Sequence, residues 1–242
     1  LDTEPFLDAN GDGIGDFAGL VRRLDYLEAL GVDAIWLAPF QPTPDRDDGY
    51  DITDYYGVDP RYGSSGDFVE FMRETRNRGI KVVMDLVVNH TSDRHPWFRD
   101  ARSSPTAQHR DWYLWSKRRP KYWKQGMVFP GHQKSTWSRD EAAGEWYYHR
   151  FYDFQPDLNW ANPAVREEMR RVIGYWLELG VAGFRLDAVP FIIEMTDPRR
   201  AKAPQDFELL YDLRRFAQLR AGDAVLLGEA NVPPKEQMAF FG

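Results

Sequence analysis

The chain has 242 residues, enough for one large α/β domain, and its 43% hydrophobic content allows a sizeable core. A formal net charge of −7, from 31 basic and 38 acidic residues, argues against a nucleic-acid partner. The absence of cysteine excludes disulfides and thiolate metal sites, and it fits a cytoplasmic protein. No apolar run approaches the roughly 18 residues that span a bilayer, so we expect no membrane partner.

Amphipathic segments alternate with short apolar runs along the chain. Helical spacing of apolar residues predicts helices at Asp16–Leu30, Asp67–Arg78, Pro163–Leu179 and Asp206–Arg220. Apolar runs predict buried strands at Ala34–Pro39, Lys81–Val88, Gly183–Ala188 and Ala224–Ala230. Strands that alternate with helices and are apolar on both faces indicate a parallel sheet covered by helices.

Polar residues able to do chemistry follow successive predicted strands. His90 follows the second strand, Asp187 ends the third, and Glu229 ends the fourth. A (β/α)8 barrel places its active site at the carboxyl ends of its strands, and so does a doubly wound sheet. Because the chain has no Gly-rich phosphate loop, the doubly wound alternative is weaker. The fold class predicted is therefore α/β, a partial (β/α)8 TIM barrel.

The connection from Val88 to Pro163 is too long for a simple loop and is rich in tryptophan. We predict a barrel domain over 1–90 and 163–242, and an inserted subdomain over 91–162, after the third barrel strand. The segment Leu1–Phe6 is too short and irregular for a full strand, and the chain stops where a helix begins. These features suggest a fragment that carries about strands 1–5 of the barrel.

Two carboxylates stand out as a pair. Glycosidic bonds are broken between two carboxyl groups, which lie about 5–5.5 Å apart in retaining enzymes. Asp187 and Glu229 end adjacent predicted strands and can face one pocket. Arg185, two residues before Asp187, lies on the same side of its strand and would hold that carboxylate ionised. The alternative reading is a buried structural ion pair.

An acidic loop, DANGDGIGD, occupies residues 8–16. Side-chain oxygens at Asp8, Asn10, Asp12 and Asp16, with the carbonyl of Ile14, give the alternating spacing that a hard cation prefers. The loop matches the start of an EF-hand loop, but it lacks the final Glu and a preceding helix. We expect a structural Ca²⁺ site here; the alternative is a solvated turn.

Four short motifs carry a family resemblance. The stretches DLVVNH (Asp85–His90), GFRLDAVP (Gly183–Pro190) and LGEAN (Leu227–Asn231) resemble three ordered signatures of the α-amylase superfamily, glycoside hydrolase family 13. The stretch QPDLN (Gln155–Asn159) resembles a motif of the branch that holds trehalose synthases and oligo-1,6-glucosidases. The similarity runs from about Asp8 to Gly242.

The resemblance implies a role for each matching residue. Asp187 would be the nucleophile, Glu229 the general acid/base, and Arg185 would orient Asp187. The family's transition-state-stabilising Asp follows the next strand, so we expect it beyond Gly242. We expect the bare 242-residue chain to be inactive and poorly stable.

Substrate-binding residues follow from the same resemblance. His90 would hydrogen-bond the hydroxyls of the cleaved glucose, Tyr50 would stack under that sugar, and Asp47 would cap the non-reducing end in exo-acting members. In many α-amylases the residue matching Asn89 binds another Ca²⁺, which the QPDLN branch usually lacks. Asn89 is therefore predicted to be structural or pocket-lining.

The motifs imply a retaining enzyme acting on α-glucosides such as maltose, trehalose or short malto- and isomalto-oligosaccharides. They most resemble enzymes that interconvert maltose and trehalose through a covalent glucosyl-enzyme, with no organic cofactor. The alternatives are an exo-acting α-glucosidase or oligo-1,6-glucosidase, and an α-amylase. A non-enzymatic alternative is the catalytically silent barrel subunit of a transporter, which usually lacks the carboxylates present here.

Overall fold

Four parallel strands form the main sheet of the computed structural model, which describes residues 1–195 and 203–241. The strands are β1 (Ala34–Leu37), β2 (Lys81–Leu86), β6 (Gly183–Leu186) and β7 (Val225–Gly228), in the order β1-β2-β6-β7. All three pairings are parallel, and they align Asp85 with Arg185 and Arg185 with Leu227. The carboxyl ends of β2, β6 and β7 therefore meet at one edge.

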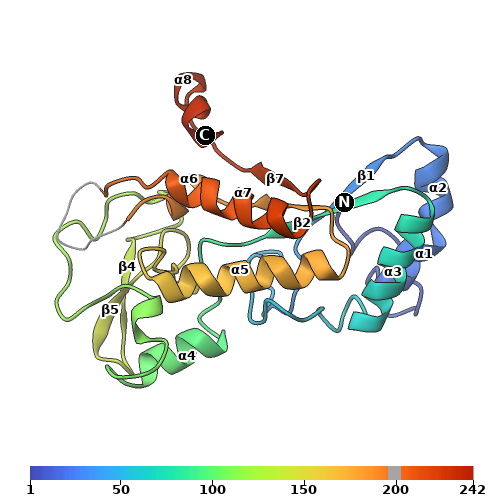
Figure 1. Cartoon of the computed structure of the whole chain (residues 1–242). Helices are drawn as coiled ribbons and strands as arrows, with labels where there is room; N and C mark the ends of the chain where they lie inside the picture. Colours follow the sequence, from blue (N-terminus) through green and yellow to red (C-terminus); the bar gives the residue numbers. More distant parts are fainter. Residues whose placement is uncertain (196–202, 242) are drawn as a thin grey trace.

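Helices connect these strands and cover one face of the sheet. They are α1 (Phe17–Arg22), α2 (Leu24–Ala29), α3 (Ser65–Asn77), α5 (Pro163–Glu178), α6 (Val189–Ile192) and α7 (Glu208–Arg220). Figure 1 shows α5 and α7 side by side along the sheet, and α1 to α3 at the end of the molecule where β1 lies. The single helix expected at Asp16–Leu30 is two helices, because the backbone leaves the helical region at Arg23.

The helix-covered face carries the hydrophobic core. Ile35 and Leu37 of β1, Met84 of β2 and Phe184 of β6 are 4% exposed or less. They pack with helix residues such as Trp176, whose indole Nε1 donates to the Tyr55 carbonyl at 2.9 Å. Side chains alternate between the two faces of a strand, so the residues between these core positions point the other way.

The opposite face of the sheet is open to solvent at its two edges. Trp36 of β1 is 46% exposed, and Leu227 of β7 is 48% exposed. Arg185 projects from this same face, because its guanidinium carbon lies 5.2 Å from the centre of the Trp36 ring. In a closed barrel this face is the packed interior.

The segment of the chain between β2 and α5 forms a second, antiparallel sheet. It contains β3 (Trp115–Ser116), β4 (Trp137–Asp140) and β5 (Glu145–Tyr148) in the order β3-β5-β4, preceded by α4 (Pro96–Ser103) and η1 (Arg110–Trp112). Figure 1 shows this region at the end of the molecule opposite α1 to α3. The insertion follows β2, the second strand of the described sheet.

As the sequence suggested, Leu1–Phe6 forms turns instead of a strand. Leu1 nevertheless pairs with the edge of β1: its amino group donates to the Trp36 carbonyl, and its carbonyl accepts from Ala38 at 2.9 Å. This is the pattern of a parallel neighbour reduced to one residue. The parallel sheet thus has four strands in the described residues, the four that the apolar runs of the sequence predicted.

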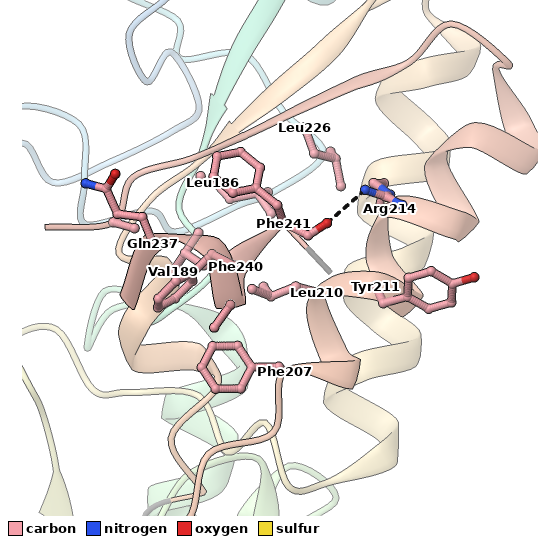
Figure 2. A pocket seen from close by; sticks show the side chains of 13 residues that line it. Leu186, Val189, Phe207, Leu210, Tyr211, Arg214, Leu226, Gln237, Phe240 and Phe241 are labelled. Carbon is pink, nitrogen blue, oxygen red and sulfur yellow. Dashed lines mark hydrogen bonds between the residues drawn. The ribbon is translucent and has the colours of Figure 1, made fainter. Parts of the chain in front are cut away.

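The C-terminal segment crosses the helix-covered side of β7. It contains α8 (Pro234–Gln237) and η2 (Met238–Phe240), and the Phe240 ring meets that of Phe207 edge-on at 5.2 Å. An apolar cavity of about 350 Å³ lies between this segment, α7 and the sheet (Figure 2). Arg214 donates to the Phe241 carbonyl at 3.1 Å across it. Across residues 1–195 and 203–241, every helix is too short or too polar to cross a membrane.

Candidate active site

One arginine gathers three carboxylates at the carboxyl ends of β2, β6 and β7. The Nη1 atom of Arg185 lies 2.8 Å from Asp85 Oδ2 and 3.2 Å from Asp187 Oδ1. The Nη2 atom lies 2.5 Å from Glu229 Oε2. Asp85 is fully buried, whereas the Glu229 side chain is 51% exposed at the mouth of the site. The sheet register creates this cluster, because Asp85 and Arg185 face each other on neighbouring strands.

Asp187 and Glu229 share more than this arginine. Glu229 also acts on Asp187 electrostatically. Burial first, and then the neighbouring Glu229 carboxyl group, raises the pKa of Asp187 to about 8, although Arg185 acts in the opposite direction. The Arg185 guanidinium thus holds Asp187 and Glu229 as a pair at the end of the sheet.

The backbone turns sharply just after Asp187. Ala188 has φ = 59°, a left-handed conformation that costs a non-glycine residue roughly 1–3 kcal/mol. The turn leads directly into α6, so Asp187 stands at the tip of β6. The amide of Val189 donates to the Glu229 carbonyl at 3.2 Å, which ties this turn to the end of β7. One strained residue thus lies directly beside the proposed nucleophile.

His90 lies in the wall of the site as a neutral ring. Its Nε2 is 3.0 Å from the Tyr50 carbonyl, which can only accept, so Nε2 carries the hydrogen. Nδ1 then accepts from the Asn89 amide at 3.3 Å. Burial lowers the pKa of His90 to about 4, so the ring is uncharged at neutral pH. The Tyr50 carbonyl therefore fixes the tautomer of His90, and the Asn89 amide supports it.

Tyr50 and Asp47 come from the loop that follows β1. The Tyr50 hydroxyl donates to Asp85 Oδ2 at 3.2 Å, which joins it to the arginine cluster. Asp47 Oδ2 accepts from the Gln155 amide at 2.7 Å, and burial raises the pKa of Asp47. Gln155 is fully buried and belongs to the QPDLN stretch of the insertion. Barrel loop and insertion thus meet at Asp47.

These side chains surround one cavity of about 440 Å³. All six catalytic and substrate-binding residues named from the sequence line it. Its full lining is Asp47, Tyr50, His90, Val128, Phe129, Phe151, Arg185, Asp187, Ala188, Pro190, Phe191, Glu229 and Asn231. The sheet and the insertion each contribute a wall, and the volume is within the range of small-molecule sites.

Sequence reasoning missed several residues of this site. Asp85 and Gln155 lie inside recognised motifs, so a closer reading of those motifs could have found them. Phe129 and Phe151 line the cavity from the insertion, and their rings lie 6.0 Å apart. Nothing in their sequence context separates them from the many core aromatics of the chain.

In the acidic loop at residues 8–16, carboxylates accept hydrogen bonds from backbone amides instead of from an arginine. Asp8 accepts from the amides of Asn10, Gly11 and Gly13, at 3.1, 2.6 and 2.8 Å. The Gly13 and Gly11 hydrogen bonds lower the pKa of Asp8. Asp16 caps α1 by accepting from Gly19 at 2.6 Å.

Within that loop, Asp12 accepts from the Ile14 amide at 2.8 Å and from the Asn10 side chain at 3.1 Å. In the described parts of the chain, no three His, Cys, Asp or Glu side chains converge closely enough to hold a metal ion. The loop oxygens suit a hard cation chemically, but they turn toward loop N–H groups instead of one centre.

Comparison with known proteins matches the site to a family. The model of the alpha amylase catalytic domain matches residues 3–242. The fold and the motifs agree with this match, and the chain belongs to the alpha-amylase family of catalytic domains. The resemblance and the fold class derived from the sequence are thereby confirmed.

Individual relatives show which members of the family the chain is similar to. The chain is 45% identical, over its whole length, to a trehalose synthase from Thermus thermophilus, of which it covers 25%. It is 41% identical over 97% of its length to an oligo-1,6-glucosidase from Parageobacillus thermoglucosidasius, of which it covers 44%. The structure of Bacillus licheniformis trehalose-6-phosphate hydrolase matches with a TM-score of 0.88, 36% identity, and coverage of 98% of this chain and 44% of that one. The chain therefore spans less than half the length of these relatives.

Proposed function

We propose that this chain provides the nucleophile and the general acid/base of a retaining enzyme that transfers glucosyl groups from α-glucosides. The observation that carries the proposal is the Asp187–Glu229 pair held by Arg185 at the base of a cavity. Two carboxyl groups held beside one guanidinium supply what the two steps require, a nucleophile and a proton donor and acceptor.

The chemistry follows from this division of roles. The Asp187 carboxylate attacks the anomeric carbon, the glycosidic C–O bond breaks, and Glu229 gives its proton to the departing oxygen. An acceptor hydroxyl then attacks the same carbon, passes its proton to Glu229 and releases Asp187. Arg185 favours the ionised form of Asp187 between these steps.

The substrate-binding residues complete the proposal. Neutral His90 can donate its Nε2 hydrogen to a sugar hydroxyl in exchange for the Tyr50 carbonyl. Asp47 lines the cavity as a hydrogen-bond acceptor opposite Gln155. An acceptor at this position closes the cavity to a longer glucan chain, which suits a substrate that presents a terminal glucose.

For the acceptor, we favour the released glucose over water, so that maltose and trehalose interconvert. Relatives named trehalose synthase support this choice, since those from three bacteria match at 44–45% identity over 98–100% of the chain. A hydrolase is the second candidate, because relatives named oligo-1,6-glucosidase and alpha-glucosidase match at 41–46% identity. The catalytic steps are shared, and only the acceptor differs.

Incubation of the full-length protein with maltose tests the proposal. Trehalose as the main product supports the interconverting enzyme, and glucose alone supports the hydrolase. A fluoroglucosyl probe should label Asp187 in either case, because both acceptors attack the same intermediate. Turnover without labelling of Asp187, or no turnover of any α-glucoside, would refute the assignment of the nucleophile.

For the acidic loop, we propose a structural Ca²⁺ site formed by Asp8, Asn10, Asp12, Ile14 and Asp16. The oxygen-only donor set supports it, as does the close wrapping of the loop around its own side chains. Binding requires the side chains to exchange some N–H partners for the ion. Ca²⁺ titration monitored by calorimetry should give one site, and an Asp12→Ala variant should lose it.

A further inference from the structure

The loop that carries Asp47 has an unusual backbone. Asp45, Asp48 and Gly49 have φ values of 61°, 46° and 88°, so Asp47 is flanked by two left-handed aspartates. Such a conformation is costly for residues other than glycine, and it persists only where the surroundings hold it. The position of Asp47 therefore depends on contacts made by its neighbours.

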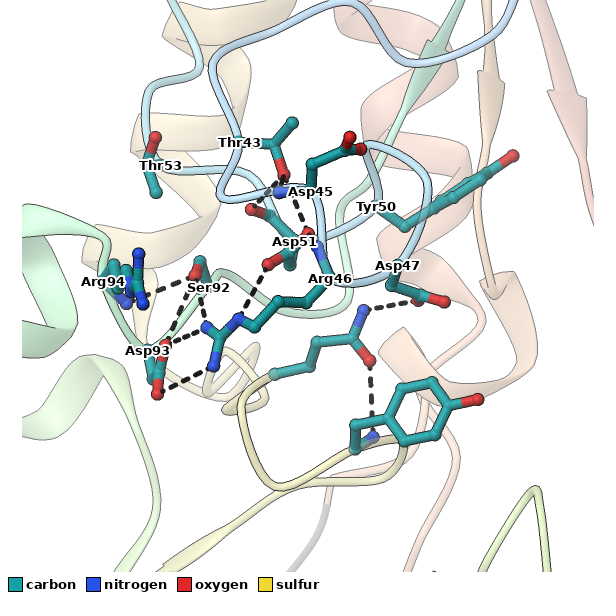
Figure 3. Close-up of polar contacts among 12 residues, drawn as sticks. Thr43, Asp45, Arg46, Asp47, Tyr50, Asp51, Thr53, Ser92, Asp93 and Arg94 are labelled. Atoms are coloured by element: carbon teal, nitrogen blue, oxygen red, sulfur yellow. Dashed lines mark hydrogen bonds and ion pairs between the residues drawn. The ribbon is translucent and has the colours of Figure 1, made fainter. Parts of the chain in front are cut away.

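Arg46 makes the most extensive of these contacts (Figure 3). Its Nε lies 3.3 Å from Asp51 Oδ2, and its backbone amide donates to the other Asp51 oxygen at 3.1 Å. Its Nη2 donates to Ser92 Oγ at 3.2 Å and pairs with Asp93. Asp51 is fully buried, so this cation balances a charge that has no access to water.

Arg46 also reaches the insertion. Its guanidinium carbon lies 4.3 Å from the centre of the Phe154 ring, and the Phe154 carbonyl accepts from the Asp93 amide at 2.8 Å. Asp47, the next residue, accepts from Gln155, the next residue after Phe154. Two consecutive loop residues thus contact two consecutive insertion residues.

The two loop side chains have different surroundings. Asp47 lines the cavity, whereas Arg46 is absent from its lining and is directed to Ser92 and Asp93. Any influence of Arg46 on a bound sugar must therefore pass through the loop backbone. Another arginine, Arg61, holds Asp45 at 2.5 Å on the preceding side of Asp47.

We propose that Arg46 is a positioning residue, which fixes Asp47 against the insertion and so sets the preference for a terminal glucosyl group. The proposal rests on the function proposed above for Asp47 and its cavity. We call the contacts of Arg46 with Asp51 on one side and with Ser92 and Asp93 on the other the clamp. A guanidinium is required because it bonds both sides of the clamp at once while its face stacks on Phe154. A lysine could keep the charge but only one of these contacts.

The test uses Arg46→Met in the full-length protein, with p-nitrophenyl α-glucoside and p-nitrophenyl α-maltoside blocked at its non-reducing end as substrates. We expect KM for the glucoside to rise about tenfold, with kcat changed less than about threefold, because an aligned hydrogen bond is lost at binding. Preference for the glucoside over the blocked substrate should fall about tenfold. Arg46→Lys should lie between Arg46→Met and the wild type.

Arg78→Met is the matched control, since Arg78 pairs with Asp25 and Glu74 at similar exposure but far from the cavity. If Arg46→Met does not fold, Asp93→Ala removes the opposite side of the clamp and should give the same KM shift. Unchanged KM and preference in a folded variant, or equal changes in Arg78→Met, would overturn the proposal. Wild-type turnover of the glucoside tests the proposed function separately.

Discussion

Two groups of carboxylates in this chain differ in their burial and in their hydrogen-bond partners. In the cavity, Asp85 and Asp187 are buried, and one guanidinium, that of Arg185, serves them both. In the acidic loop, Asp8 and Asp12 lie at the surface, and backbone amides satisfy them without any arginine. The residue type is the same, but the partner and the depth differ.

The pKa shifts follow this difference. Burial and Glu229 raise the pKa of Asp187 to about 8, whereas the Gly13 and Gly11 amides lower that of Asp8. Burial thus favours the protonated form of the carboxyl group in the cavity, whereas backbone N–H groups favour the ionised form in the loop. The ionised carboxylates of the loop suit cation binding.

Asp187→Asn should reduce kcat by about 10⁴-fold or more, because the amide cannot form the glucosyl ester. Steady-state kinetics of the full-length protein on maltose measures this loss. Asp12→Asn is the matched control, since it makes the same change in the loop and should leave kcat within about twofold. Comparable losses in the two variants would break the contrast between the two groups.

Arg185→Met should leave buried Asp85 and Asp187 without their cation, a change that typically costs about 3–5 kcal/mol. Without the positive charge, the pKa of Asp187 should rise further, and the acid limb of the pH–kcat profile should move to higher pH. Thermal unfolding and pH–rate measurements check both effects. An unshifted acid limb in a folded variant would contradict the role given to Arg185.

The raised pKa of Asp187 also predicts a pH effect on stability. Between about pH 4 and pH 8 the folded state holds a proton that the unfolded state has lost, so stability falls as pH rises through this window. Asp187→Asn has no such proton, so its Tm advantage over wild type should grow from pH 5 to pH 8. A constant difference across this range would show that Asp187 ionises normally in the fold.

Ca²⁺ should have the smallest effect and leave the cavity unchanged. If the loop binds Ca²⁺ at about 100 times its Kd, the ion stabilises the fold by roughly 2.7 kcal/mol, a few degrees in Tm. Chelation should remove this increment from wild type but not from Asp12→Ala, as differential scanning calorimetry can show. An identical response in both proteins would rule out the loop as the binding site.

Much of the fold could be predicted, because the spacing of apolar residues along the chain indicates where helices and strands lie. The predicted strands agree with the observed ones to within two residues at each end, since apolar runs such as KVVMDLVV are bounded by glycine and polar segments. The break at Arg23 could not be foreseen, because Asp16–Leu30 keeps helical spacing across it. Tertiary packing decides such breaks, and local propensity does not.

In the site, the motifs identified the residues but not their contacts. The i, i+2 relation of Arg185 and Asp187 follows from strand geometry, whereas the bond between Asp85 and Arg185 needs the sheet register. The clamp from Arg46 to Asp93 joins residues 47 positions apart, and no local pattern encodes it.

The exposed face and edges of the parallel sheet have a consequence for handling the protein. Leu1 is the only residue among those described that pairs with the outer edge of β1, and β7 has a partner on one side only. Open edges beside apolar side chains such as Trp36 and Leu227 are templates for strand addition. A purified 242-residue chain should therefore self-associate and bind hydrophobic dyes, and covering this face should restore a monodisperse protein.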